Sequence, residues 1–145
     1  MTRTLQPRSR TREPDEVTVV VVDDQAVFRH AAWEVIAATP GFRPVGHAES
    51  GDAALRLVEK LDPALVLLDL RMPGMDGVET SRRIAVAHSR TVVVLITVED
   101  AAGLPDDVSE CGAAAVARKQ EFCPRMLRTL WDAHGRGPLS RGSAE

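Results

Sequence analysis

The sequence predicts a doubly wound α/β fold, in which a five-stranded parallel sheet carries helices on both faces. Short apolar runs alternate with segments of helical periodicity, which is the pattern of successive strand–helix units. The run Leu65 to Leu68 is continuously apolar and lies between Asp62-Pro63 and Pro73-Gly74, as expected for a central strand buried on both faces. Right-handed crossovers place the carboxyl ends of all parallel strands at one edge of such a sheet.

The first third of the chain supplies two strands and one helix. Val17 to Val22 is almost entirely β-branched and predicts a buried strand. A helix follows, because apolar residues recur at helical spacing at Phe28, Ala31, Ala32, Val35 and Ile36. Thr39-Pro40-Gly41 ends this helix, and Phe42 to Ala48 is the second strand.

The middle of the chain continues this alternation. Ser50 is the expected N-cap of a second helix. Its apolar stripe comprises Ala54, Leu57, Val58 and Leu61. After the central strand, a third helix extends from about Asp76 to His88. The fourth strand, Thr91 to Ile96, ends at Thr97.

The last third of the chain is less regular. Gly103 and Pro105 interrupt the segment from Val98 to Gly112, so any helix there is short and starts near Pro105. Ala113 to Ala117 is the fifth strand. The final helix has Pro124 in its first turn, and its stripe comprises Leu127, Leu130, Trp131 and His134.

The length and composition fit one globular domain. Of the 145 residues, we assign 17–134 to this domain, between an N-terminal tail at 1–16 that we expect to be disordered and a flexible tail at 135–145. The net charge of −3 gives no general attraction to nucleic acid or anionic membranes, and no apolar run approaches the roughly 18 residues of a membrane span. Cys111 and Cys123 form no metal-binding pattern, so we expect buried or idle thiols of a reducing cytoplasm.

Polar side chains follow four of the predicted strands. Asp23 and Asp24 follow the first strand, Asp69 the third, Thr97 the fourth and Lys119 the fifth. In open α/β sheets, chemistry takes place just outside these carboxyl ends. Three carboxylates that meet there cannot all stay ionised unless a cation lies among them. A ligand set of oxygen atoms, without His or Cys, favours Mg²⁺.

These residues together predict a pocket for a phosphoryl group in transfer. Lys119 offers a positive charge and Thr97 a hydroxyl donor, and the metal ion neutralises the oxygens of the transferred group. Asp69 is best placed as the nucleophile, because an aspartate can form an acyl phosphate. Taken singly, each residue has an ordinary structural explanation. Only their joint position at strand ends favours the pocket.

The motifs VVVVDD, LLDLRMPGMDG and LIT, with Lys119 after a strand, resemble the receiver domains of two-component response regulators. The resemblance covers about residues 17–134 and implies the flavodoxin-like receiver fold. It also implies that Asp69 is the phosphoacceptor. The Mg²⁺ ligands it implies are Asp23, Asp24, Asp69 and the backbone carbonyl of Arg71, and the residues that bind the phosphoryl oxygens are Thr97 and Lys119.

The same resemblance implies the partners. The phosphoryl donor is a phosphohistidine on a sensor histidine kinase, and the only reactions at Asp69 are its own phosphorylation and dephosphorylation. The motif LRMPGMDG and the absence of proline after Lys119 resemble the subfamily that usually carries a helix-turn-helix output domain. A homodimer or a downstream protein is expected to contact the face formed by the family's fourth and fifth helices.

Three residues depart from the family pattern around the switch. Val116 stands three residues before Lys119, where the family usually has an aromatic ring that moves together with the threonine. Gln120 replaces the proline that often follows the lysine, so the peptide bond before it is expected to be trans. Val98 follows Thr97 where the family prefers a small residue, and its bulk is expected to narrow the phosphoryl entrance.

Arg71 and Glu99 each lie two residues past a pocket residue and have opposite charges. We expect them to pair across the mouth of the site. Such a pair contributes little stability when it is exposed, so its expected role is to control the lifetime of the phosphoryl group. Without a ring at Val116, signalling is expected to proceed through rearrangement of the backbone and of the family's fourth helix.

Three other functions are possible for a chain of this fold, and particular residues favour or disfavour each. A receiver whose switch has decayed would be a phosphorylation-independent docking module, which Val98 and Val116 favour and the intact pocket disfavours. A Mg²⁺-dependent hydrolase acting through an aspartyl phosphate would need an acid two residues past Asp69, where this chain has Arg71. A flavin-binding protein is disfavoured, because no Ser/Thr/Gly-rich phosphate loop follows the first strand.

Overall fold

Five parallel strands form one sheet in the order β2-β1-β3-β4-β5. The computed structural model describes residues 16–135, and its strands are β1 (Val17–Val22), β2 (Phe42–Ala48), β3 (Leu65–Asp69), β4 (Val92–Thr97) and β5 (Ala115–Arg118). The central strand β3 lies between β1 and β4, and all five of its residues are buried. The predicted doubly wound α/β class is confirmed.

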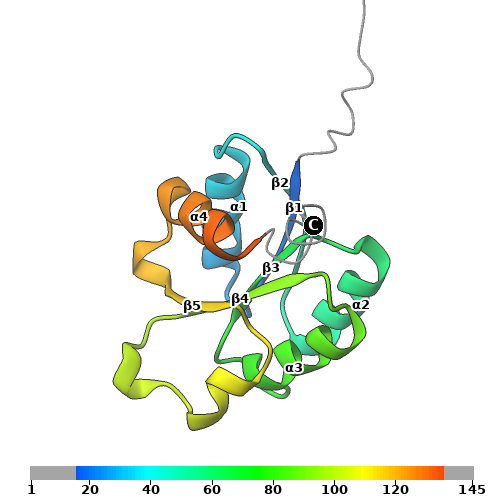
Figure 1. Cartoon of the computed structure of the whole chain (residues 1–145), viewed down its shortest axis with the longest axis vertical. Helices are drawn as coiled ribbons and strands as arrows, with labels where there is room; N and C mark the ends of the chain where they lie inside the picture. The colour runs from blue at the N-terminus through cyan, green and yellow to red at the C-terminus, as the bar shows by residue number, and fades with distance from the viewer. Residues whose placement is uncertain (1–15, 136–145) are drawn as a thin grey trace, which may run out of the picture.

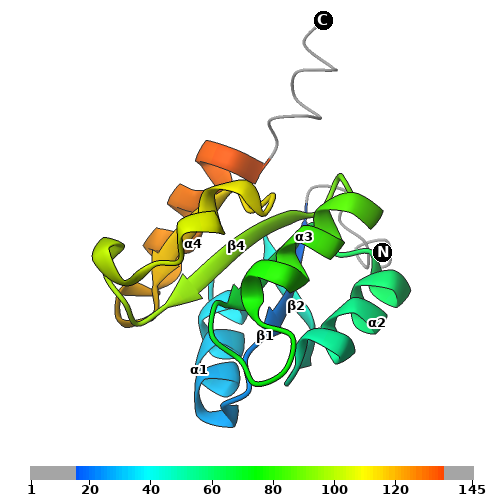
Figure 2. The same cartoon turned by 90° about the horizontal axis from the view of Figure 1, so that it is seen from below.

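Four α-helices cover the two faces of this sheet: α1 (Ala26–Ala37), α2 (Gly51–Leu61), α3 (Gly77–Ala87) and α4 (Pro124–Leu130). Helices α1 and α4 lie on one face, and α2 and α3 on the other (Figures 1 and 2). The expected N-cap of α2 is confirmed, because the Ser50 hydroxyl accepts a hydrogen bond from the Ala53 N–H. Asp76 caps α3 in the same way, at the predicted start of that helix.

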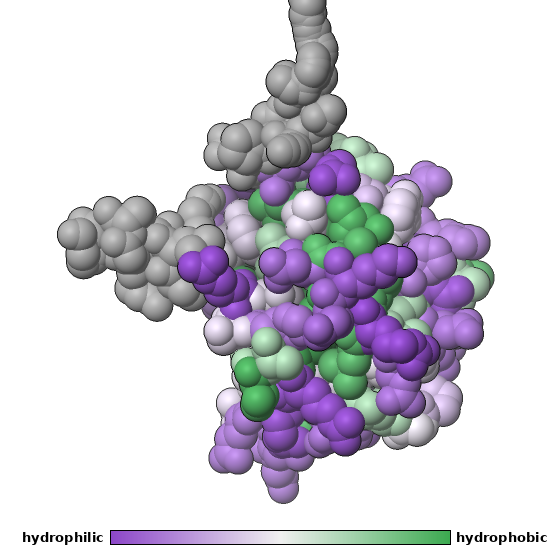
Figure 3. Space-filling view, turned by 90° about the vertical axis from the view of Figure 1, so that its right-hand side faces the viewer, coloured by the Kyte–Doolittle hydropathy of each residue, from purple (hydrophilic) through white to green (hydrophobic). Residues whose placement is uncertain are grey.

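Alternate residues of the strands form two apolar layers. On the α1/α4 side the layer is built around Val19, Val21, Leu65, Leu67, Val94, Ile96, Ile36 and Leu127. On the α2/α3 side it is built around Val20, Val22, Val66, Leu68, Val93, Leu95, Val58 and Ile84. Burial on both faces explains why these strands are apolar without a break. The outer surface over α2 is covered mostly by hydrophilic side chains (Figure 3).

Several element boundaries differ from those predicted. Ala31 is exposed, because the buried stripe of α1 is narrower and centres on Ala32 and Ile36. Thr91 precedes β4, and its hydroxyl donates to the Pro63 carbonyl at 2.9 Å. The fifth strand begins at Ala115, later than predicted, because Gly112 adopts a left-handed conformation (φ 86°) that turns the chain before it joins β4. It ends at Arg118, one residue later than predicted.

No α-helix connects β4 to β5. The segment contains two 3₁₀ helices, η3 (Ala101–Gly103) and η4 (Asp106–Glu110), so the predicted interruption is confirmed and the helix expected near Pro105 is only a 3₁₀ turn. Gly103 has low helix propensity, and Pro105 disfavours helical geometry in the residue before it. Cys111 at the end of this segment is buried, and Cys123 is exposed.

The last helix is shorter than its apolar stripe predicted. Pro124 is in its first turn as expected, but the α-helix ends at Leu130 and a π-helical turn, η6 (Trp131–Gly135), follows. The Trp131 ring stacks edge-on against Phe42, with 6.4 Å between ring centroids. Among the described residues, no helix is long and apolar enough to span a membrane. The predicted tails at 1–16 and 135–145 lie outside the described residues, apart from residues 16 and 135 themselves.

The start of α3 packs directly against the end of β3. A Cβ atom at Gly77 would meet the Asp69 carbonyl oxygen and would lie 2.7 Å from the Leu70 Cα atom. Both contacts are with backbone, which cannot move without shifting the end of the central strand. We therefore expect Gly77→Ala to lower the free energy of unfolding by about 1–3 kcal/mol, measured by urea denaturation.

Gly74 in the same loop provides the control. Its φ of 76° needs a residue that tolerates the left-handed region, and a Cβ atom there would meet nothing within 4 Å. Asn tolerates this conformation, so Gly74→Asn should unfold close to the wild type. Equal stability of Gly77→Ala and Gly74→Asn would contradict the packing argument.

Candidate functional site

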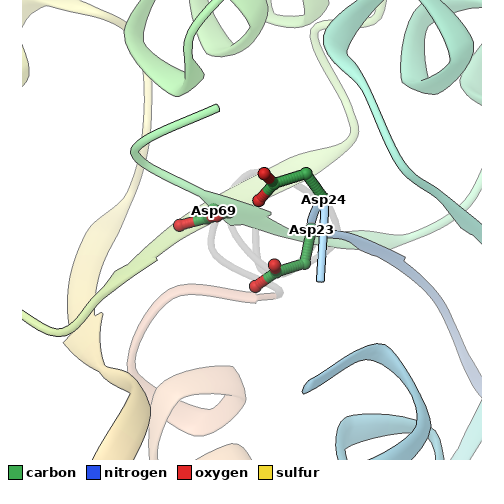
Figure 4. A group of neighbouring side chains, drawn as sticks. All are labelled: Asp23, Asp24 and Asp69. Atoms are coloured by element: carbon green, nitrogen blue, oxygen red, sulfur yellow. The ribbon is translucent and has the colours of Figure 1, made fainter. Parts of the chain in front are cut away.

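Three carboxylates meet at the carboxyl edge of the sheet. Asp23 and Asp24 follow β1, and Asp69 is the last residue of the neighbouring strand β3. One carboxylate oxygen from each residue lies within 4.8 Å of the other two, and the three side chains project toward the same space (Figure 4). Asp23 and Asp69 are buried, whereas Asp24 is exposed. The sequence therefore predicted the acidic cluster correctly.

Lys119 brings one positive charge to this cluster. It follows β5, two strands away from β3, and its long side chain reaches across the end of β4. The ammonium Nζ lies 2.6 Å from Asp23 Oδ2 and 3.6 Å from Asp69 Oδ1. The Lys119 side chain is only 15% exposed, so this charge is largely shielded from water.

Backbone groups fix the orientation of the two buried acids. Asp23 Oδ1 accepts a hydrogen bond from the Gln25 N–H at 2.8 Å, and the Asp23 carbonyl accepts one from the Arg29 guanidinium, also at 2.8 Å. Asp69 Oδ1 accepts a bond from the Arg71 N–H at 3.3 Å. Asp23 Oδ2 has no hydrogen bond of good geometry and faces the Lys119 ammonium instead.

The charge of the cluster opposes ionisation of Asp69. Burial, followed by the negative charge of Asp23 and more weakly that of Asp24, raises the pKa of Asp69 from 3.8 to about 6. The Lys119 ammonium and the Arg71 N–H act in the opposite direction but do not compensate. A cation held among the three carboxylates would remove this conflict.

The donor set fits Mg²⁺. Mg²⁺ prefers oxygen ligands, commonly takes one or two carboxylates, and fills its remaining positions with water or phosphate oxygens. Asp23, Asp24 and Asp69 supply carboxylate oxygens from two adjacent strand ends, and one of them is exposed to solvent. Among residues 16–135, this is the group of three acids, histidines or cysteines that could hold a metal ion.

Thr97 occupies the corresponding position on the next strand. It is the last residue of β4 and stands one residue beyond Ile96, the register partner of Asp69. The side chain is buried, and its hydroxyl oxygen accepts a hydrogen bond from the Glu99 N–H at 3.1 Å. The hydroxyl group also has a proton that it can donate to another group. All five predicted pocket residues thus lie at one edge of the sheet.

A family model for the response regulator receiver domain matches residues 19–130. The chain belongs to this family. It is 33% identical over 125 residues to the NarL transcriptional regulatory protein of Mycobacterium tuberculosis, covering 86% of this chain and 58% of that protein. It is 35% identical over 114 residues to the response regulator GacA of Pseudomonas protegens, covering 79% and 54%. The receiver thus spans about half the length of these curated relatives.

Solved structures support the same assignment. The signal receiver domain of NarL from Mycobacterium tuberculosis superposes with a TM-score of 0.77 at 31% identity, covering 86% of this chain and 99% of that one. Relatives among transcriptional regulators agree with the subfamily that the LRMPGMDG motif predicted. The chain is therefore a receiver domain of two-component signalling.

The predicted pair at the mouth of the receiver site is present. The Arg71 guanidinium donates two hydrogen bonds to the Glu99 carboxylate, at 3.1 and 3.0 Å. A third bond, which the sequence did not predict, runs from Arg71 to the Gly103 carbonyl at 3.1 Å. One side chain therefore ties the loop after Asp69 to the segment after β4.

The residues that depart from the receiver pattern lie beside this segment. Val98 is 64% exposed, and its backbone carbonyl accepts a hydrogen bond from the Gln120 side chain at 3.3 Å. Val116 is 37% exposed and pairs in register with Leu95. The peptide bond between Lys119 and Gln120 is trans, as predicted. The effects of Val98 on access and of Val116 on switching remain predictions.

Sequence reasoning missed one neighbour of Lys119. The ammonium lies 4.9 Å from the centroid of the Phe28 ring, a distance typical of cation–π contacts. The periodicity of α1 placed Phe28 in a core stripe, and it does pack there against the α1/α4 layer. Its position one helical turn after Asp24 was the available signal, since that turn begins at the edge that carries the acids.

The raised pKa of Asp69 predicts that its charge destabilises the metal-free protein. A carboxyl whose pKa is higher in the folded than in the unfolded state contributes stability at low pH that is lost as the pH rises through the folded value of about 6. At neutral pH in a chelator, Asp69→Asn should therefore be more stable than the wild type by about 1–3 kcal/mol. The difference should shrink at mildly acidic pH, as measured by urea unfolding.

Asp52→Asn is the matched control, because Asp52 is an exposed acid in the first turn of α2. It should show no gain in stability. Mg²⁺ should stabilise the wild type more than Asp69→Asn and so close the gap at neutral pH. A metal-free wild type that is already the more stable of the two would rule out this account of the cluster.

Proposed function

We propose that this receiver takes a phosphoryl group from a sensor histidine kinase onto Asp69, with Mg²⁺, and thereby changes a surface that a partner reads. The observation that carries the proposal is the convergence of three carboxylates within 4.8 Å, with the Lys119 ammonium 2.6 and 3.6 Å from two of them. The expected location is the cytoplasm, where the kinase domain and the two reduced cysteines would both be found.

In the transfer step, an Asp69 carboxylate oxygen attacks the phosphorus of the phosphohistidine. The new O–P bond forms as the P–N bond breaks, and the electron pair of that bond stays on the imidazole nitrogen. In the hydrolysis step that resets the receiver, water attacks the same phosphorus, the O–P bond to Asp69 breaks, and inorganic phosphate leaves. Both steps place negative charge on the phosphoryl oxygens, which the site has to stabilise.

The described residues supply that stabilisation. Mg²⁺, held by Asp23, Asp24, Asp69 and the Arg71 carbonyl, would neutralise phosphoryl oxygens and orient the nucleophile. Lys119 already lies between two of the carboxylates and can follow the charge from Asp69 to its phosphoryl oxygens. Thr97 accepts a bond from Glu99 and keeps its own proton for a phosphoryl oxygen.

Polar contacts offer a route from this pocket to the surface. Arg71 joins the loop after Asp69 to Glu99 and Gly103, and Gln120 joins the residue after Lys119 to the Val98 carbonyl. Phosphorylation adds about −1.5 to −2 charges, which would draw cations toward Asp69 and bias a pre-existing equilibrium of the segment after β4. A homodimer partner or a downstream protein would read this segment together with α4.

A docking module that works without phosphorylation is the second candidate. The observation in its favour is that Val98 and Val116, two of the three residues that depart from the family around the switch, are exposed and apolar. Such a module would bind its partner equally well with and without a phosphoryl group on Asp69. The arrangement of the pocket favours the phosphoacceptor.

The primary test is the intact mass of the protein after incubation with acetyl phosphate and Mg²⁺. We expect a phosphoryl adduct on the wild type, because the attacking carboxylate and the stabilising charges are already assembled. Asp69→Asn should carry no adduct, and Asp52→Asn, which alters an exposed acid outside the site, should be phosphorylated normally. Adduct on Asp69→Asn, or none on a wild type that binds Mg²⁺, would exclude Asp69 as the phosphoacceptor.

The Arg71–Glu99 pair is expected to set the lifetime of the phosphoryl group. Arg71→Glu or Glu99→Arg places like charges across the mouth of the site and should change the rate of dephosphorylation severalfold. The double reversal restores opposite charges and should return the rate toward the wild type. Loss of adduct over time, followed by mass spectrometry, gives these rates.

Arg83 and Glu79 on α3 form a matched control pair. Arg83 is 56% exposed and Arg71 55% exposed, and each binds a glutamate through its guanidinium. Reversing Arg83 should leave the dephosphorylation rate unaltered, since this ion pair involves none of the pocket residues. If the Arg71, Glu99 and Arg83 variants all dephosphorylate like the wild type, the pair does not control the lifetime.

A further inference from the structure

The Lys119 ammonium has neighbours of two chemical kinds among the described residues. Two are the carboxylates of Asp23 and Asp69, and the third is the Phe28 ring, whose centroid lies 4.9 Å away. The ring contact is well within the roughly 6 Å limit for cation–π attraction. Because the lysine side chain is only 15% exposed, water weakens this attraction little.

The Phe28 ring is held in place from two sides. It is partly buried against the apolar layer under α1, and its centroid lies 6.2 Å from that of Phe122, with the rings tilted by 52°. Phe122 follows the short 3₁₀ helix η5 (Lys119–Glu121) that begins with the lysine itself. The chain has only three phenylalanines and no tyrosine, and two of the three rings pack together here, Phe28 against the ammonium and Phe122 against Phe28.

We propose that Phe28 is a positioning residue, which keeps the Lys119 ammonium at the phosphoryl site while its anionic partners are engaged elsewhere. This inference rests on the proposed phosphoacceptor function. Asp23 and Asp69 offer oxygens that Mg²⁺ would bind, and a bound cation weakens their hold on a second positive charge. The Phe28 ring offers no oxygen to Mg²⁺, so its attraction for the ammonium persists when the metal is present.

The Phe28 ring would thereby help to stabilise the negative charge that develops on the phosphoryl oxygens during transfer. Without the ring, the long and flexible lysine side chain would be free to leave the edge of the sheet once Asp23 is occupied. With the ring, the ammonium stays within reach of Asp69 and of the phosphoryl oxygens beside it. A preorganised charge of this kind accelerates transfer because it needs no rearrangement during the reaction.

The experiment is a fluorination series at Phe28. Phenylalanine analogues with increasing numbers of ring fluorines keep the size of the ring and progressively weaken the negative face that attracts a cation. With acetyl phosphate at saturating Mg²⁺, Asp69 attacks phosphorus and acetate leaves with the electron pair of the broken P–O bond. We expect the rate of this step to fall stepwise, by about three- to tenfold for the most fluorinated ring.

Phe42 is the matched control. It also has a cation over its ring, the Arg128 guanidinium at 5.0 Å, but it starts β2 at the opposite edge of the sheet from the acids. The same analogues at Phe42 should leave the phosphorylation rate unchanged. An equal decline at Phe42 and Phe28 would show a general effect of fluorination and would overturn the inference.

A Lys119→Gln background separates positioning from packing. The protein without the ammonium should react slowly, and the Phe28 series should then give one constant rate. A decline that persists without Lys119 would overturn the inference. Should the fluorinated proteins fail to fold, Phe28→Tyr keeps an aromatic face and should react like the wild type, whereas Phe28→Leu should be slower by a similar factor.

The outcomes for the two proposals are distinguishable. A wild type that takes no phosphoryl group contradicts the proposed function itself. A wild type that is phosphorylated on Asp69, with the same rate for every Phe28 analogue, leaves the function intact and removes the positioning role. Thermal unfolding of each variant shows whether any loss of rate follows a loss of the fold.

Discussion

The imbalance of charge at the carboxyl edge of the sheet is the constraint on which the site depends. Three carboxylates face one ammonium, because the Arg71 guanidinium pairs with Glu99 and the Arg29 guanidinium binds the backbone carbonyl of Asp23, not its carboxylate. The remaining negative charge, added to burial, raises the pKa of Asp69 to about 6. Such a site is unbalanced in its ionised form, because no cationic side chain among the described residues neutralises the remaining carboxylate charge, and the proposed phosphorylation would add further negative charge.

The fold makes this arrangement possible by fixing backbone positions before any side chain is considered. Parallel pairing of β3 with β1 and β4 sets the acids and Thr97 side by side. The Leu70 N–H donates a hydrogen bond to the Ile96 carbonyl at 2.9 Å, and the Gly77 N–H donates one to the Leu70 carbonyl at the same distance. The loop that starts at Asp69 is therefore anchored at both ends, and the acid is held by the most buried strand of the protein.

The sequence predicts the parts of this structure that depend on periodicity and chain order. Five strand ends and a right-handed topology were enough to bring Asp23, Asp69 and Lys119 together. The failures have local causes. A weak 3₁₀ segment gives no periodic signal, so η3 and η4 could not be assigned. The contacts of Phe28 with Lys119 and of Arg71 with Gly103 depend on side-chain directions between elements far apart in the chain, which a linear pattern does not encode.

Two polar contacts share a destination that suits a receiver without an aromatic switch. Arg71 lies two residues past Asp69 and Gln120 next to Lys119, and both side chains end on the segment that begins at Val98. That segment is held by short 3₁₀ turns, so shifting it disrupts fewer backbone hydrogen bonds than displacing a complete α-helix would. A change of charge at Asp69 would therefore act on two polar side-chain contacts with one segment that has only short 3₁₀ helices. No moving ring at Val116 is then required.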